Sequence, residues 1–91
     1  SPVIKLTTTA SSKWEMQIAA DPTGTDIVWE SNKLDGGSSV KPQSTNGKFA
    51  GSHLGRNTFK MGTYWIRVRE PNSAGVWQPW TEWHSPFHVV S

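Results

Sequence analysis

The side chains with the most evident chemistry in this chain are aromatic and cationic. Six of the 91 residues are tryptophan, and Trp77, Trp80 and Trp83 recur at a spacing of three within one segment. Arg67 and Arg69 stand two residues apart a short way upstream. Indole rings stack on sugar rings, and they also stack on planar guanidinium groups. These residues are therefore suited either to binding a ligand through open indoles or to packing indoles against the chain's own cations.

The spacing of the three tryptophans fits polyproline II conformation. On a strand, residues three apart point to opposite faces, and on an α-helix each third residue is turned away by about 60°. Polyproline II has three residues per turn, so indoles spaced by three share one edge. Pro79 fixes its own φ near this conformation and disfavours the α region for Gln78. We predict a row of aligned indoles over residues 77–83.

The two arginines belong to a predicted strand over residues 62–70, whose pattern alternates with period two. Its two faces hold Tyr64, Ile66 and Val68 on one side, and Trp65, Arg67 and Arg69 on the other. Arginines two apart on a strand are roughly 7 Å apart, and tryptophans three apart on polyproline II are roughly 9 Å apart. Guanidinium groups can therefore fit between the indoles. The predicted ladder consists of Trp65, Arg67, Arg69, Trp77, Trp80 and Trp83, and its expected role is structural.

The histidines do not predict a metal site. His84 and His88 are four apart, but their segment has the pattern of an extended strand, on which they would be roughly 13 Å apart. His53 has no partner that the sequence reveals, and we expect all three histidines at the surface.

The carboxylates do not form the pattern of a glycosidase or nuclease site. Glu15 and Glu30 are expected on neighbouring strands, where they could face each other, and we interpret them as solvated positions opposite lysines. We predict no catalytic residue, no metal and no cofactor.

The composition limits the class of protein. With 91 residues, the chain has room for one small domain, over residues 1–91. The absence of cysteine excludes a disulfide framework and a thiolate metal site. The net charge of +2 comes from scattered lysines, so we expect no nucleic acid partner. No apolar run approaches the roughly 18 residues of a membrane span, so we expect no membrane insertion. Because the chain begins with Ser-Pro, we expect a module of a larger protein.

The pattern of the whole chain predicts an all-β fold. Short alternating runs are separated by residues typical of turns, and no helical period is sustained. The expected strands lie near residues 3–9, 13–18, 27–29, 39–43, 48–53, 62–70 and 87–90, and a further one could start at residues 58–60. About seven or eight strands with this spacing predict an antiparallel β-sandwich.

The sequence of residues 59–69, followed by the Asn-Ser-Ala-Gly turn of residues 72–75, resembles the last third of a fibronectin type III domain. In that immunoglobulin-like family, Phe59, Gly62 and Tyr64 would occupy the positions of the tyrosine corner. The resemblance covers roughly residues 58–91. The segment 77–83 is also similar to the Trp-Ser-x-Trp-Ser box of cytokine receptors, in which tryptophans interleave with arginines of the neighbouring strand.

The resemblance implies a non-catalytic module. It would act as a spacer or as an adhesion and interaction unit of a larger secreted, cell-surface or phage structural protein. Its partners would be neighbouring domains of that protein, and a protein or glycan surface. The location would be extracellular, at the cell surface or in a virion. The alternative is a carbohydrate-binding module that uses exposed tryptophans, with Trp29 and Trp80 as the candidate ligand-binding residues.

Overall fold

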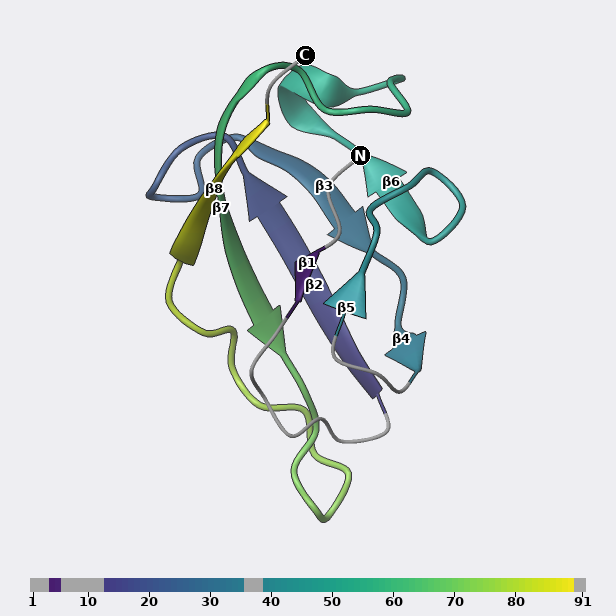
Figure 1. The fold of residues 1–91 in the computed structure, drawn as a ribbon. Coiled ribbons are helices and arrows are strands. Elements are labelled where there is room, and N and C mark those ends of the chain that lie inside the picture. The colour runs from purple at the N-terminus through teal and green to yellow at the C-terminus, as the bar shows by residue number, and fades with distance from the viewer. Residues whose placement is uncertain (1–3, 6–12, 36–38, 90–91) are drawn as a thin grey trace.

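A computed structural model describes residues 4–5, 13–35 and 39–89, and shows an all-β fold centred on one antiparallel sheet (Figure 1). Five strands follow one another across this sheet in the order β6-β3-β2-β7-β8. Their bounds are β2 Lys13–Ala19, β3 Ile27–Ser31, β6 Gly47–Phe49, β7 Gly62–Arg69 and β8 His84–Val89. The short strand β4 (Leu34–Asp35) pairs with the start of β2. The prediction of an all-β class is confirmed for the residues described.

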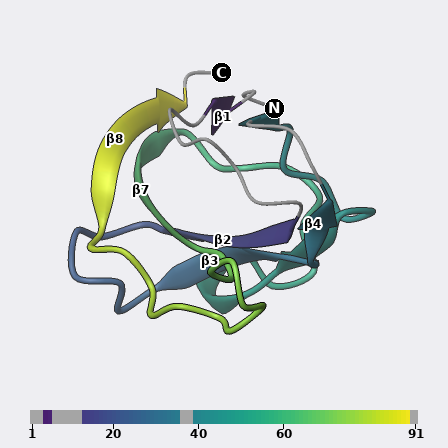
Figure 2. The same ribbon diagram turned by 90° about the horizontal axis from the view of Figure 1, so that it is seen from below.

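A second, small sheet consists of β1 (Ile4–Lys5) and β5 (Ser39–Val40). In the view from below, β1 lies across the interior from β2 and β3, while β8 curves from the edge of the large sheet towards it (Figure 2). Val40 of β5 is buried and joins the same core cluster as the inward side chains of the large sheet. The core therefore lies between the large sheet and this two-stranded ribbon.

The period-two patterns of β2 and β7 place the core as the sequence predicts. Trp14, Met16 and Ile18 of β2 are buried, and the residues between them face outward. Tyr64 and Ile66 of β7 are buried in the same cluster. Since successive side chains of a strand point to opposite faces, Arg67 and Arg69 lie on the outer face of the sheet.

The loop-rich middle of the chain forms shorter strands than the sequence predicts. β5 ends at Val40, two residues before Pro42, which has no N–H to donate to a ladder. β6 ends at Phe49, because the chain then enters a short 3₁₀ turn, η1, over Gly51–His53. No strand forms at residues 58–60, and β7 begins only at Gly62. Most of the strand expected over residues 3–9 lies outside the described residues.

The turn between β2 and β3 is held by the carboxylate of Asp21. Its oxygens accept hydrogen bonds from the backbone N–H groups of Thr23, Thr25 and Asp26 and from the Thr23 hydroxyl. These bonds, of which that from the Thr23 hydroxyl has the largest effect, hold the pKa of Asp21 well below its usual range. The turn is therefore preorganised, and it presents Gly24 towards the C-terminal part of the chain.

His53 is buried, which corrects the expectation that all three histidines lie at the surface. Its side chain is 2% exposed and packs edge-to-face on the ring of Tyr64. Its Nε2 accepts a hydrogen bond of 3.0 Å from the Lys60 N–H and lies 3.1 Å from the Tyr64 hydroxyl. Tyr64 in turn donates to the Lys60 carbonyl at 2.5 Å. The ring of Phe59 completes this cluster, with its centroid 5.2 Å from that of Tyr64.

The hydrogen bonds of His53 favour its neutral form. Because the Lys60 N–H can only donate, Nε2 must carry a lone pair. Burial lowers the pKa of His53 from its usual value of 6.5, and the positive charges of Lys60 and Arg56 lower it further, while Asp26 opposes them. An unfolded chain therefore binds a proton at His53 more readily than the folded chain does. The resulting contribution to stability is fully present above about pH 6.5 and is lost as the pH falls below it.

We predict that His53→Gln makes the stability less dependent on pH. Between about pH 7.5 and about pH 5, the melting temperature of the wild type should fall further than that of the variant, because only the wild type must exclude a proton from this site. Circular dichroism melts at several pH values would measure the difference. His88→Gln, which changes an exposed histidine, is the control and should keep the wild-type slope. An equally steep slope in His53→Gln would contradict the prediction.

Candidate functional site

The segment 77–83 runs antiparallel to β7 without being a regular strand. The backbone contacts of this segment and of the start of β8 join Gln78 to Glu70, which directly follows β7, Thr81 to Val68, and His84 to Ile66. The first two are N–H to carbonyl bonds of 3.0 and 2.9 Å. Every third residue of the segment therefore meets every second residue of β7. Since each tryptophan directly precedes one of these contact residues, the indoles repeat in step with the arginines.

The two arginines lie between the three indoles. The guanidinium carbon of Arg67 is 4.9 Å from the ring centroid of Trp80 and 4.5 Å from that of Trp83. That of Arg69 is 5.5 Å from Trp77 and 4.6 Å from Trp80. All four distances are within the range of cation–π contacts. We call Trp77, Arg69, Trp80, Arg67 and Trp83 the indole–cation stack.

Two residues that the sequence did not single out close the ends of the stack. The ammonium nitrogen of Lys33 lies 5.6 Å from the ring centroid of Trp77. At the other end, a side-chain carbon added at Gly24 would overlap the indole of Trp83, so this glycine lies directly against the ring. Gly24 has a φ of +75°, which suits glycine. The Asp-Pro-Thr-Gly sequence of residues 21–24 is typical of a turn, but only the tertiary contact shows what the turn covers.

Trp65 lies outside the indole–cation stack, although the predicted ladder included it. It is partly buried and pairs with Ala19 of β2. None of the aromatic or cation–π contacts among the described residues involves Trp65. The repeat of three would place the next indole at position 86, which is Pro86. The segment therefore has no further ring to extend the stack towards Trp65.

Trp29 is part of the core, which overturns its candidacy as a ligand-binding residue. Its side chain is 0% exposed, and its indole N–H donates to the Gln43 carbonyl at 3.1 Å. A carbon added at Gly47 would meet the same ring. Because Trp29 directly follows buried Val28, period two does not describe this part of β3.

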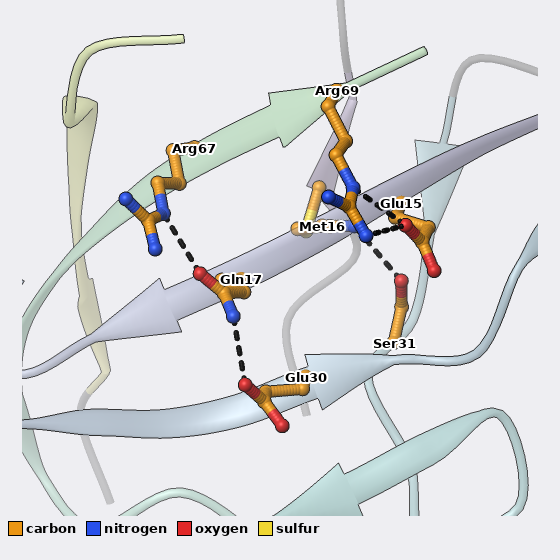
Figure 3. A network of polar contacts seen from close by, with 7 residues as sticks. All are labelled: Glu15, Met16, Gln17, Glu30, Ser31, Arg67 and Arg69. Carbon is orange, nitrogen blue, oxygen red and sulfur yellow. Dashed lines mark hydrogen bonds and ion pairs between the residues drawn. The ribbon is translucent and has the colours of Figure 1, made fainter. Parts of the chain in front are cut away.

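Polar side chains of β2 and β3 hold the two arginines in place (Figure 3). Arg69 donates from Nε and Nη2 to Oε1 of Glu15, at 2.7 and 2.6 Å. Arg67 donates from Nε to Oε1 of Gln17 at 2.7 Å, and Gln17 donates from Nε2 to Oε1 of Glu30 at 2.7 Å. The register explains these partners, since Glu15 is opposite Arg69 and Gln17 is opposite both Arg67 and Glu30. The sequence had suggested that Glu15 and Glu30 could face each other. They do not, because Gln17 is the residue of β2 opposite Glu30.

The guanidinium of Arg67 is partly removed from water. Burial lowers its pKa from the usual value, the positive charge of Arg69 lowers it further, and Glu30 raises it. Arginine nevertheless remains charged at neutral pH. Glu15 balances the charge of Arg69 directly, and Glu30 balances that of Arg67 through Gln17. The stack thus contains paired cations whose faces are used for ring contacts.

The described residues offer few other kinds of site. No group of three or more histidine, aspartate or glutamate side chains among them is placed to hold a metal ion. Within the same residues, no helix is long and apolar enough to cross a membrane. In the comparisons with known proteins, no family model, curated protein or solved structure matches this chain. The function of this chain is therefore inferred from the geometry of the stack and its surroundings.

We predict that Arg67→Ala destabilises the fold by about 2 kcal/mol. The substitution removes two ring contacts and the bond to Gln17. Urea unfolding, followed by tryptophan fluorescence, would measure the change. Arg56→Ala is the matched control, because the exposed side chain of Arg56 bonds the Thr58 carbonyl two residues away, and it should cost less than about 0.5 kcal/mol. Equal effects of the two substitutions would contradict a stabilising role for the stack.

We also predict that Gly24→Ala costs more stability than Gly75→Ala. Both glycines have positive φ, of +75° and +80°. Only at Gly24 would the new methyl group meet an indole, whereas nothing lies within 4 Å of the corresponding position at Gly75. We expect about 1 kcal/mol for Gly75→Ala and about 2 to 3 kcal/mol for Gly24→Ala. Equal losses would show that Gly24 does not support Trp83.

Proposed function

We propose that this chain is a non-catalytic, fibronectin type III-like or immunoglobulin-like β-sandwich module of a larger secreted, cell-surface or phage structural protein. In this role it serves as a stiff spacer or interaction unit between neighbouring domains. The bond from the Tyr64 hydroxyl to the Lys60 carbonyl supports the fold assignment, because a tyrosine corner bonds back to the backbone a few residues upstream. The ribbon of β1 and β5, with Val40 in the core, supports a sandwich.

The observation that carries this proposal is that the ring faces of the stack are occupied. Two guanidinium groups contact the ring of Trp80, Lys33 and Arg69 both contact the ring of Trp77, and Arg67 contacts that of Trp83. Gly24 lies against Trp83. A carbohydrate-binding module that stacks sugars on open indoles needs uncovered ring faces. The arrangement therefore favours a structural role for these three tryptophans over the alternative.

The energetic scale of the stack suits a stiffening role. Five cation–ring contacts of about 0.5 to 2 kcal/mol each are not additive, but together they are a substantial share of the roughly 5 to 15 kcal/mol that stabilise a small domain. They attach an irregular segment to the outer face of β7. A spacer gains from this because local opening of the sheet becomes rarer.

Hydrogen exchange would test the stiff-spacer proposal. Amides of β7 should exchange only through global unfolding in the wild type, and through more frequent local opening in Trp80→Ala. A glycan array probed with the wild type and Trp80→Ala would test the alternative. Fast exchange of β7 in the wild type would overturn the proposal. Glycan binding that needs the Trp80 ring, with unchanged exchange in Trp80→Ala, would favour the carbohydrate-binding module.

A further inference from the structure

Beside the indole–cation stack, the outer face of the sheet has a shallow depression. Its space is about 370 Å³, including the part open to solvent. It is lined by Glu15 and Gln17 of β2, Glu30 and Ser31 of β3, and Arg69 and Trp80 of the stack. Ligand sites typically have volumes of roughly 300 to 1,000 Å³ and a few converging polar groups. The part of this depression that compares with such sites is about 170 Å³, so it is smaller than they are and open to solvent.

The two carboxylates and the hydroxyl of the depression each form a hydrogen bond within the chain, and each keeps a further donor or acceptor for a ligand. Oε1 of Glu15 is used by Arg69, and Oε1 of Glu30 is used by Gln17 (Figure 3). The Ser31 Oγ accepts the Met16 N–H at 2.8 Å, which orients the hydroxyl. No hydrogen bond within the described part of the chain uses Oε2 of Glu15, Oε2 of Glu30 or the hydroxyl proton of Ser31. Two acceptors and one donor thus remain for a ligand, at fixed positions.

The charge of the depression indicates which ligand it would take. Its two carboxylates are matched by two guanidinium groups, with Arg69 on Glu15 and Arg67 reaching Glu30 through Gln17. A cation would meet no excess of negative charge, and an anion would be opposed by both carboxylates. Neutral molecules that donate several hydrogen bonds avoid both penalties. Hydroxyl groups on adjacent carbons of a sugar ring have this property.

We propose that the depression binds a neutral saccharide through its hydroxyl groups. The hydroxyls donate to Oε2 of Glu15 and Glu30, and one accepts from Ser31. Since the faces of Trp80 are covered, the sugar lies along the edge of this indole and not on its face. The inference goes beyond the spacer role and does not depend on it, because it assigns a ligand to groups that the stack merely orients. Preorganisation by the stack lowers the cost of binding.

Titration by nuclear magnetic resonance would test the site. The ¹⁵N-labelled chain would be titrated with glucose, galactose, mannose, N-acetylglucosamine and xylose, each up to about 50 mM, where weak sugar binding is detectable. We expect at least one sugar to shift the signals of Glu15, Gln17, Glu30 and Ser31 together with the indole N–H of Trp80. Absence of shifts with every sugar, or shifts confined to another surface, would overturn the proposal.

A pair of variants would show whether the carboxylate takes part. Glu30→Gln keeps the side-chain oxygen that Gln17 needs, and we expect binding to become about tenfold weaker because one acceptor is replaced by a donor. Glu82→Gln changes an exposed carboxylate outside the depression and should leave affinity unchanged. Equal affinity of the two variants would count against the site, as would shifts at Glu15 and Glu30 with Ca²⁺ or free lysine in place of a sugar.

Discussion

The stacking of Arg67 and Arg69 between three indoles is the interaction on which the outer half of this structure depends. The segment 77–83 has few backbone bonds to β7, so its position is set mainly by its side chains. A guanidinium group removed from water is costly unless it is paired and hydrogen-bonded. Here, the indoles contact the faces of the cations, while Glu15 and Gln17 bond their edges. One layer of side chains thereby links β3, β2, β7 and the irregular segment.

The same layer decides what the surface can do. Ring faces that would stack on a ligand are already in contact with cations, which favours the structural role proposed for the three tryptophans of the segment. The groups that remain open are carboxylate oxygens and a hydroxyl on β2 and β3, and the arginines and backbone hold these in fixed positions. Stability and a candidate binding site thus share one set of hydrogen bonds.

The parts of the fold that could be predicted are those with a local signature. The alternation of Trp14, Met16 and Ile18 identified both the strand β2 and its buried face, and the spacing of the indoles indicated that arginines could fit between them. Other features had no local signature. The buried side chains of Trp29 and His53 find their hydrogen-bond partners elsewhere in the chain. Trp29 bonds the Gln43 carbonyl, and His53 bonds Lys60 and Tyr64. Trp65 shares a face with the arginines, yet the segment has no indole to reach it.

The sequence by itself determined the all-β class, the inward faces of β2 and β7, and the matching repeats of arginine and tryptophan. These follow from periodicity, which acts over a few residues because backbone geometry sets where each side chain points. Only the tertiary structure decided that Lys33 and Gly24 close the stack, that Gln17 and not Glu15 faces Glu30, and that the ring faces are covered. Those outcomes depend on strand register and on contacts between residues far apart in the chain, which no local pattern contains.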